Sequence, residues 1–524
     1  MTSEKKVHSF SQQRKILIVQ DGKVAISHNH TDTGEAVPII ASLFLDPVCV
    51  NTYIGGVKLY DTLAGLNAMM QNVPGWRMRI TNRRRYAFTS KGQRKISGRF
   101  FVDYFALDTK DSMHSRIPRK RIDVINLDLL REKPPKSPTE QLEMCLALFE
   151  MTDNRGVKLR GTRGAIGTAM LKASPYWEKG RYAAPKFVNS AARKYLPGNF
   201  YSLSSKVANK SLLRLPHCYY IDQTSAHHNI AQQIELPHPQ AIHHRVFRKP
   251  IDPRSEIGQK FLATHIGLLE CNIDIGTLPP SEAYLYPPWA QQRGRRKVYV
   301  WTPELRLLAD RRLQLDAITA SFTATTADLV LPEYARWSLR EIASNIQRAQ
   351  YKKGSLLAAY GMLAFNGAGK TVYRYWGGNN SRSKCEIPGA GVVSESVIPI
   401  NPNIQLSTVN VIARGMIEAE TRTRSIEYAR ELHRQGFHVP QIYADGVLVE
   451  TDSLPFVREG WRISHSLTNV HIPRSNAIIS DQIVKLPGAA GGEQDRAWER
   501  TREASQIILP TGTVIPTETV PMLV

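Results

Sequence analysis

Two aspartates in this chain each follow an aromatic, apolar run and stand beside a turn: Asp222 in YYIDQTSAHH and Asp445 in QIYADGVLV. Acids at strand ends can project into a common cleft, where two carboxylates hold divalent cations about 3.5 to 4 Å apart. Such cations activate an attacking hydroxyl and stabilise a phosphoryl group in transfer. Taken singly, an aspartate in this position is more often a turn former, so the pattern needs support from other residues.

A basic helix is expected between the two aspartates, in KKGSLLAAYG. Lys353 and Tyr360 are seven residues apart and would lie two turns apart on one helix face. A lysine there can contact triphosphate oxygens, and a tyrosine ring can stack below a base. On most helices, however, a lysine is simply a solvated side chain and a tyrosine simply a packed one. Along the chain, the strand with Asp222 comes first, the basic helix second and the hairpin with Asp445 third. This order favours a functional role for Lys353 and Tyr360.

The elements that must position these residues follow from local patterns. CYYID predicts a strand leading into a polar turn and a helix, and HVPQIYADGVLVETD predicts a strand, a tight turn and a second strand. Residues 335–365 predict a long amphipathic helix with cations three or four residues apart. A further long helix is expected to end at Gly436.

Elsewhere, residues 15–50 and the run RFFVDYFALD predict strands of an α/β N-terminal domain with a basic surface. The prolines of KPPKSP indicate a linker ahead of a helix in which Leu142, Leu146 and Phe149 repeat at helical spacing. Residues 233–296 are rich in Pro, His and Arg, which predicts an irregular insertion. KVYVW and TPELRLLADRRLQL then predict a strand and a helix with a threonine cap.

The 524 residues include 69 Lys and Arg against 46 Asp and Glu, a formal net charge of +23 that is spread along the chain. Such a length predicts several subdomains, since single cores stop growing near roughly 250 to 300 residues. The charge favours a polyanionic partner such as nucleic acid. On charge alone, a basic protein with no nucleic-acid partner is the alternative.

The five scattered cysteines contain no CxxC pair, which argues against a disulfide framework or a zinc ribbon and favours a reducing cytoplasm, that of the host if the protein is viral. The histidine pairs have no cysteine or carboxylate at ligand spacing, so we expect structural or nucleic-acid-facing roles for them. Without an apolar N-terminal region or an apolar run of roughly 18 to 20 residues, we expect neither a signal peptide nor a membrane span.

The segment DQTSAHH resembles motif A of family B DNA polymerases, which reads DxxSxYP. It keeps Asp222 and Ser225 but has His227 and His228 where tyrosine and proline are usual. In the family that tyrosine packs against C2′ of the sugar and excludes ribonucleotides. The smaller imidazole of His227 therefore predicts weaker discrimination against ribonucleotides.

Motifs B and C of the same family are also similar to segments of this chain. Motif B reads KxxxNSxYG, and KGSLLAAYG keeps Lys353, Tyr360 and Gly361 but has leucine and alanine at the Asn-Ser positions. Motif C reads YxDTDS, and YADGVL keeps Tyr443 and Asp445 but has a valine, residue 447, at the second Asp.

The missing second acid of motif C leaves two alternatives. Asp445 alone performs both tasks after a small shift of the hairpin, or the site is catalytically impaired. Glu450 and Asp452, further along the strand, are weaker substitutes.

The resemblance covers roughly residues 190–480 and is to the protein-primed branch of the family. RKYLPGNFYSL resembles the YxGG-type element before motif A. GWRISHSLTNVHIPRSNAII is similar to the segment with the KxY element, with Arg474 in the lysine place and Asn476 where tyrosine is usual. Arg474 either grips the primer backbone or is a plain surface arginine.

The resemblance implies an α/β (α+β) fold: a right-hand polymerase with palm, fingers and thumb, plus an N-terminal ribonuclease-H-like exonuclease domain. We expect that domain to be degenerate and inactive, because after KILIVQ only Asp21 appears where DxE is needed, and Tyr104 to Asp108 match YxxxD in letters alone. The expected parts are 1–189 (exonuclease-like), 190–240, 297–330 and 401–456 (palm, with motif A in the first and motif C in the last), 241–296 (insertion resembling terminal-protein region 1), 331–370 (fingers with motif B), 371–400 (hairpin resembling terminal-protein region 2) and 457–524 (thumb and tail).

The function implied is that of a DNA-directed DNA polymerase, a nucleotidyltransferase that adds dNMP by a two-metal mechanism and replicates a phage or plasmid-like genome without 3′–5′ proofreading. Asp222 and Asp445 are the expected ligands of two Mg²⁺ ions, for which Mn²⁺ can substitute. Expected partners are DNA template and primer, dNTPs and a terminal protein primer, with no membrane. The expected nucleotide-binding residues are Lys353, Tyr360, Ser225, His227, Arg340 and Arg348, and the expected DNA-binding residues are Arg474, Tyr443 and Gly361.

Two other functions fit the same residues. A non-catalytic DNA-binding replication factor would have kept the polymerase fold after losing the second acid of motif C. It predicts DNA binding with steep salt dependence and no incorporation. A primer-independent polymerase would instead make product on single-stranded template with neither primer nor terminal protein.

Overall fold

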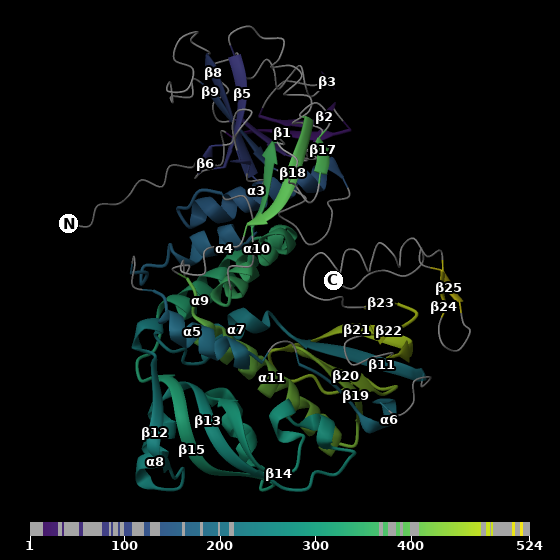
Figure 1. The fold of residues 1–524 in the computed structure, drawn as a ribbon. Coiled ribbons are helices and arrows are strands. Elements are labelled where there is room, and N and C mark those ends of the chain that lie inside the picture. The colour runs from purple at the N-terminus through teal and green to yellow at the C-terminus, as the bar shows by residue number, and fades with distance from the viewer. Residues whose placement is uncertain are drawn as a thin grey trace, which may run out of the picture. The chain divides into compact units, whose positions relative to one another are not determined.

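The computed structural model describes the side chains of residues 14–21, 23–29, 34–35, 137–159, 163–178, 182–197, 200–208, 214–365, 408–472, 478 and 480–482, and the backbone of several further strands. The chain forms two compact units, each built from two stretches of sequence (Figure 1). Unit 1 comprises Met1–Lys179 and Trp337–Thr408, and unit 2 comprises Gly180–Arg336 and Val409–Val524.

Unit 1 contains an eight-stranded sheet in the order β3 (Gly34–Glu35), β2 (Lys23–His28), β1 (Lys15–Gln20), β4 (Thr52–Gly55), β9 (Lys120–Ile125), β8 (Arg99–Ala106), β5 (Trp76–Asn82) and β6 (Arg85–Tyr86). β1 pairs antiparallel with β2 and parallel with β4, so the sheet is mixed. The strands predicted from KILIVQ, KVAIS and RFFVDYFALD are confirmed. The expected strand at 39–50 and the side chains of Tyr104 to Asp108 lie outside the described residues.

A second sheet of unit 1 has the order β17 (Lys384–Ile387), β18 (Gly391–Ile398), β16 (Lys370–Tyr375) and β7 (Gln93–Arg94). The hairpin predicted at 371–400 is therefore three strands, with β18 paired antiparallel to both β16 and β17. The side chains of these strands lie outside the described residues.

The helices of unit 1 are α3 (Pro138–Asn154), α4 (Arg163–Leu171), η9 (Ile346–Arg348) and α10 (Ala349–Leu363), and α9 (Val330–Ala343) crosses the boundary between the units. α3 confirms the helix predicted after the KPPKSP linker. The single long helix predicted over 335–365 is wrong, because the chain breaks between α9 and α10. Asn345 causes the break: its side chain accepts a hydrogen bond from the Arg348 N–H at 3.1 Å and starts a new turn.

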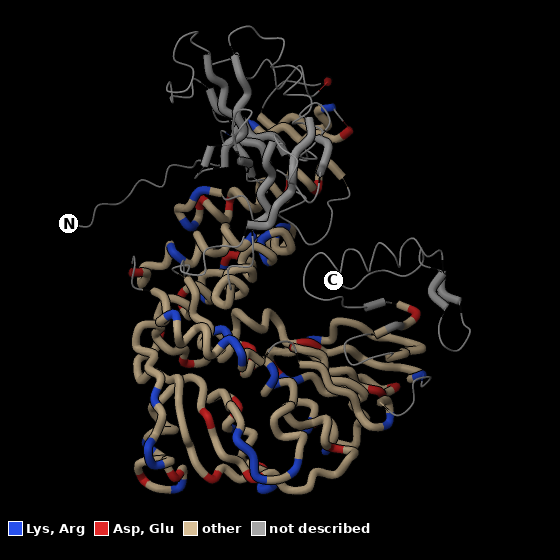
Figure 2. The backbone as a smooth tube through the Cα atoms, viewed as in Figure 1, with Lys and Arg blue, Asp and Glu red and all other residues tan. Residues whose placement is uncertain are grey.

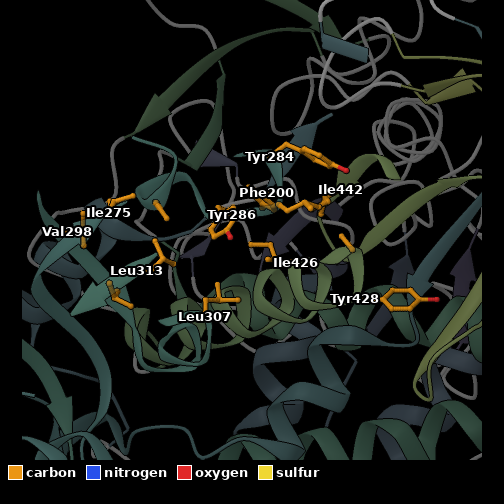
Figure 3. Packing of buried hydrophobic residues seen from close by; sticks show 14 of the residues in the cluster. Phe200, Ile275, Tyr284, Tyr286, Val298, Leu307, Leu313, Ile426, Tyr428 and Ile442 are labelled. Carbon is orange, nitrogen blue, oxygen red and sulfur yellow. The ribbon is translucent and has the colours of Figure 1, made fainter. Parts of the chain in front are cut away.

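Unit 2 contains an antiparallel sheet in the order β10 (Tyr201–Leu203), β19 (His438–Tyr443), β20 (Gly446–Glu450), β11 (Arg214–Gln223), β21 (Trp461–His471), β22 (Ile478–Ile479) and β23 (Val484–Lys485). We call it the palm sheet. The strands predicted from CYYID and HVPQIYADGVLVETD are confirmed and are neighbours in it. One face packs against α11 (Val411–Arg434), which ends before Gly436 as predicted. Figure 3 shows Ile426 of α11 and Ile442 of β19 within one apolar cluster.

The second sheet of unit 2 has the order β12 (His243–Ile251), β15 (Leu313–Ala324), β13 (Ile266–Ile275) and β14 (Gly294–Trp301). The prediction of irregular structure over 233–296 is wrong. Leu269, Cys271, Ile273 and Ile275 alternate along β13 and are buried, the period of a strand with one core face. The apolar alternation of β13 is short and lies between segments rich in Pro, His and Arg. The composition of those segments hides the strand pattern in the sequence.

The remaining elements of unit 2 are α5 (Lys186–Ala192), η4 (Arg193–Tyr195), α6 (Ser205–Ala208), α7 (Ala226–Gln233), η5 (Pro239–Ala241), α8 (Glu256–Thr264), η6 (Ala283–Leu285), η7 (Pro288–Ala290), η8 (Thr302–Ala309), β24 (Gln506–Ile508) and β25 (Val514–Pro516). The helix predicted from TPELRLLADRRLQL is shorter than expected, because β15 begins at Leu313. Its start is also different: the Glu304 carboxylate accepts from the Trp301 N–H at 3.1 Å. Among the described residues, no helix is long and apolar enough to cross a membrane.

Candidate active site

The palm sheet brings Asp222 and Asp445 to neighbouring strands. Asp222 lies near the end of β11, opposite Gly446 of β20. Asp445 lies in the two-residue turn between β19 and β20, next to Ala444 at φ +49. The Gln223 N–H donates to the Asp445 carbonyl oxygen at 2.9 Å, so the turn is tied to the end of β11.

Side-chain hydrogen bonds also fix this turn to α11. The Gln223 amide donates to the Thr421 carbonyl oxygen and to Ser425 Oγ, each at 3.0 Å. Ser425 Oγ in turn lies 3.1 Å from the Ala444 carbonyl oxygen. Because these groups are buried or partly buried, the bonds hold the hairpin against the helix and restrict the shift that Asp445 could make.

Val447, at the second motif C position, lies on the other face of the sheet. It is paired with Ile221 and is fully buried in the cluster that contains Ile426 and Ile442. Successive residues of a strand point to opposite faces, so Asp222 and its neighbour Ile221 do not share a face. An acid at 447 would therefore enter the apolar core in this register.

Gly446 is the β20 residue that lies directly across from Asp222, and it has no room for a side chain. A Cβ there would lie 2.7 Å from Tyr220 Oη and 3.0 Å from the Ile221 carbonyl oxygen. Tyr220 is buried, and its pKa is raised well above its ordinary value by burial and by the charges of Asp445 and Asp222. The tyrosine thus fills the space beside the two carboxylates.

Arg462 of β21 flanks Asp222 on its other side. Its Nε lies 3.1 Å from Asp222 Oδ1 and its Nη2 lies 3.4 Å from Oδ2. The bond to Asp222 and the charge of Asp222 raise the pKa of Arg462, and the charge of Asp445 adds to this. Arg462 could not be predicted from the sequence, because only the register of β11 and β21 places it opposite Asp222.

Glu450 does not reach the two aspartates. It pairs with Cys218, four residues before Asp222 on β11, which corresponds to about 13 Å along a strand. Its carboxylate contacts the His438 ring and lies 3.3 Å from Lys206 Nζ. The suggestion that Glu450 replaces the missing acid is therefore wrong, and Asp452 lies still further along the chain, beyond β20.

The remaining motif A residues surround the start of α7. Ser225 adopts the left-handed conformation at φ +46 and its side chain makes no capping bond to α7. Burial, with the nearby Arg414 and His228, lowers the pKa of His227 to about 3. His227 is therefore neutral at pH 7. His228 is buried near the ring of Tyr334, with ring centroids 6.5 Å apart.

Two of the expected binding residues, Tyr443 and Tyr360, are buried. Tyr443 is 5% exposed and packs edge-on against Tyr201 and Tyr220, so a direct contact with DNA is not supported. Tyr360 is 0% exposed in α10, so stacking below a base is not supported either. Arg474 lies outside the described residues.

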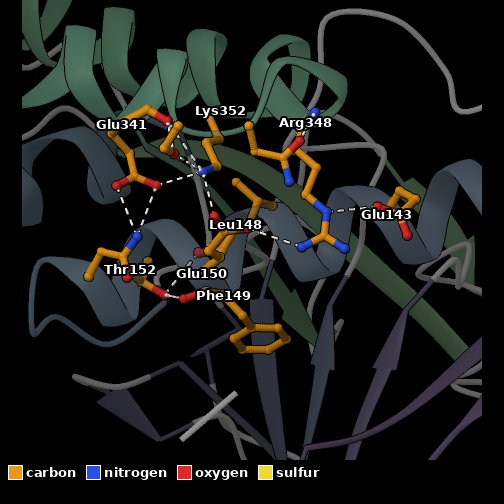
Figure 4. A network of polar contacts seen from close by, with 11 residues as sticks. Glu143, Leu148, Phe149, Glu150, Thr152, Glu341, Arg348 and Lys352 are labelled. Atoms are coloured by element: carbon orange, nitrogen blue, oxygen red, sulfur yellow. Dashed lines mark hydrogen bonds and ion pairs between the residues drawn. The ribbon is translucent and has the colours of Figure 1, made fainter. Parts of the chain in front are cut away.

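In unit 1, the lysine of α10 with the strongest contacts is Lys352, which the sequence did not distinguish from its neighbour. Lys352 is 0% exposed, and its Nζ lies 2.6 Å from Glu341 and 3.0 Å from Glu150 (Figure 4). Arg348 lies 2.8 Å from Glu143 and 3.0 Å from Glu150. We call these five residues the α10 charge network. Burial raises the pKa of Glu150, but the bonds from Lys352 and Arg348 bring it below its ordinary value.

The other expected residues of this part of the chain are more accessible. Lys353 is half-buried, Arg340 is exposed on α9, and Gly361 is exposed. A Cβ at Gly361 would meet no atom within 4 Å, so steric reasons do not require glycine there. Among the described residues, Arg348 is the cation of these three that is paired with carboxylates, those of Glu143 and Glu150. Figure 2 shows Lys and Arg distributed over both units, as the sequence indicates.

The pair Asp222 and Asp445 fits a hard divalent cation, because such ions prefer carboxylate oxygens. Within the described residues, no group of three or more His, Cys, Asp or Glu side chains could hold a metal ion. Both Asp222 oxygens already accept hydrogen bonds from Arg462.

The structure is similar to solved structures of phi29 DNA polymerase. The similarity covers 96% of this chain and 99% of the polymerase in a ternary complex with primer-template DNA and incoming nucleotides, with a TM-score of 0.53 and 12% identity. A binary complex with primer-template DNA gives a TM-score of 0.54 with the same coverage and identity, and an orthorhombic crystal form gives 0.52 at 13% identity over 91% of this chain and 89% of the polymerase. A comparison with protein-family models and curated proteins finds no match. The chain has the mixed α/β fold of these polymerase structures, as the motif resemblance predicts.

Proposed function

We propose that this chain is a template-directed DNA polymerase whose active site is built on Asp222 and Asp445. The observation that carries the proposal is their position at the end of β11 and in the β19–β20 turn, tied together by the Gln223 to Asp445 backbone bond of 2.9 Å. The likeness in fold to a polymerase solved with primer-template DNA and nucleotides supports it. The net charge of +23 suits a nucleic-acid substrate.

In the proposed reaction, the 3′-hydroxyl oxygen of the primer attacks the α-phosphorus of a dNTP. The bond from that phosphorus to the oxygen bridging to the β-phosphate breaks, pyrophosphate leaves with the electron pair, and the hydroxyl proton passes to solvent. Asp222 and Asp445 would hold the divalent cation that lowers the pKa of the hydroxyl and neutralises phosphate charge. Lys353 and the exposed Arg340 would neutralise the triphosphate, while Arg348 shapes the start of α10.

We propose that His227 contacts the sugar of the incoming nucleotide and that Ser225, in its left-handed turn, offers a hydroxyl to a phosphate. His227 is neutral, so it would act by size and not by charge. Its ring is smaller than a tyrosine, which predicts weaker rejection of ribonucleotides. A competition assay between dNTP and rNTP tests this, and strong discrimination that persists in His227→Ala would contradict it.

Extension of a labelled primer on a DNA template with Mg²⁺ and dNTPs tests the proposed function. We expect extension by the wild type and none by Asp222→Ala. Asp316→Ala is the matched control, because Asp316 has a side chain 19% exposed beside Arg295, as Asp222 has one 18% exposed beside Arg462. Loss of extension in Asp222→Ala but not in Asp316→Ala would support the assignment.

A second candidate is a non-catalytic DNA-binding replication factor. The observation that favours it is the donor set itself, in which Arg462 is bonded to Asp222 and Val447 lies in the core. This candidate predicts tight, salt-sensitive DNA binding by the wild type without incorporation. The extension assay should also be run on single-stranded template without primer. Product in that reaction would indicate a primer-independent polymerase, which neither the primed polymerase nor the binding factor would give.

A further inference from the structure

We infer that Arg462 is a built-in cation of the Asp222 and Asp445 site, which takes the place of one of two divalent ions and leaves room for a single one. This inference rests on the proposed function for its catalytic meaning. Its geometry does not, since Arg462, Asp222 and Gly446 are consecutive neighbours across three strands of the palm sheet.

The contact has the form of a charge-assisted pair. Two nitrogens of the guanidinium face the two oxygens of Asp222, at 3.1 and 3.4 Å. A planar guanidinium presents its donors as a fork, which matches a carboxylate and matches a phosphate equally well. The Arg462 side chain is 55% exposed, so it can shift one donor from Asp222 to a phosphate oxygen without leaving the site.

The charges at the site favour one divalent ion. Asp222 and Asp445 supply two negative charges, and Arg462 supplies one positive charge. Without nucleotide, one divalent ion beside them already gives the site a net positive charge. A second divalent ion would be held by the same two carboxylates and repelled by the first ion and by the guanidinium.

Two neighbouring residues remove the positions from which a further acid could act. A side chain at Gly446 would collide with Tyr220 Oη at 2.7 Å. Val447 is turned to the α11 side and is fully buried. Among the described residues, Tyr220, Gly446 and Val447 thus leave two acids and one fixed cation at this end of β11, with Glu450 about 13 Å further along the strand.

Binding of Mn²⁺ to the full-length chain, measured by electron paramagnetic resonance without nucleotide, tests the inference. We expect that Asp222→Ala and Asp445→Ala each remove one Mn²⁺ site from the wild-type total. Arg462→Ala should tighten that site by about tenfold, the order expected when one opposite charge next to a carboxylate is removed. Arg462→Lys keeps the positive charge but not the forked donors of the guanidinium. Its affinity for Mn²⁺ should lie between that of the wild type and that of Arg462→Ala.

Arg295→Ala is the control, because Arg295 pairs with Asp316 at 2.9 Å and is likewise exposed, but away from the palm sheet. It should leave Mn²⁺ binding unchanged. Loss of two Mn²⁺ sites in Asp222→Ala would overturn the inference, and so would unchanged Mn²⁺ binding in Arg462→Ala. The readout needs no incorporation, so one Mn²⁺ site in a chain that never extends a primer would refute the proposed function and leave the inference standing.

Discussion

Lys352 in unit 1 and Arg462 in unit 2 both pair with carboxylates, but their surroundings differ. Lys352 is 0% exposed and is bonded to Glu341, itself 5% exposed, and to Glu150. Arg462 is 55% exposed and faces a single aspartate. Because the Lys352–Glu341 pair is buried, its loss leaves an unpaired charge in the core and costs free energy. The Arg462–Asp222 pair is exposed to solvent, so Arg462 can exchange the aspartate for another anion at little cost. The same kind of ion pair therefore stabilises the structure in unit 1 and is available for ligand exchange in unit 2.

The largest expected effect is at Lys352. Lys352→Met leaves Glu341 buried without its cation, and removal of one partner from a buried pair costs about 3 to 5 kcal/mol. Urea unfolding would measure the loss. Its neighbour Lys353 is half-buried, so Lys353→Met should change the free energy of unfolding by less than about 1 kcal/mol while it lowers the incorporation rate. Equal destabilisation by both substitutions would contradict the contrast between them.

Gly446→Ala tests whether the space beside Asp222 is filled. The new Cβ would lie 2.7 Å from Tyr220 Oη, and we expect a destabilisation of about 1 to 3 kcal/mol. Tyr220→Phe removes the hydroxyl and should restore part of the loss in the double variant, as seen by thermal unfolding. Additive effects of the two substitutions would show that they do not collide.

His227 gives a pH-dependent test within unit 2. Its pKa is lowered from 6.5 to about 3. The unfolded chain therefore takes up a proton below pH 6.5, while the folded chain resists it until about pH 3, so stability is lost as the pH falls through this window. By pH 5 the loss from this group is about 2 kcal/mol. His227→Asn should reduce the difference in unfolding free energy between pH 7 and pH 5, and an unchanged difference would contradict the assignment.

The smallest expected effect on stability is at Arg462. An exposed pair contributes about 0 to 1 kcal/mol, so Arg462→Ala should unfold at nearly the wild-type urea concentration. A loss of several kcal/mol would show that Arg462 serves structure, as Lys352 does, and would remove the distinction between the two regions.

The palm sheet was largely predictable because its elements have strong local patterns. CYYID, QIYADGVLV and the helix ending before Gly436 appear as their periodicity indicates. The sheet of β12 to β15 was missed because its alternation lies among Pro, His and Arg. The break at Asn345 was missed because a side-chain bond to the backbone overrides the helical period.

The site was predictable only in part, since its decisive contacts depend on tertiary packing. Asp222 and Asp445 can be predicted as site residues because each follows a strand pattern and stands beside a turn. Arg462 depends on strand register, which the sequence pattern leaves open. Lys352 and Lys353 are chemically identical, and only the packing of α10 against α3 and α9 determines which one is buried.

In the proposed function, Asp222 and Asp445 act as one catalytic pair. Single-nucleotide incorporation on a primer-template with Mg²⁺ tests it most directly, with Asp445→Asn compared with Asp452→Asn, an exposed aspartate seven residues further on. We predict a loss of at least about 10² to 10³-fold for Asp445→Asn and a wild-type rate for Asp452→Asn. Wild-type incorporation by Asp445→Asn, or tight DNA binding by a wild type that incorporates nothing, would contradict the claim.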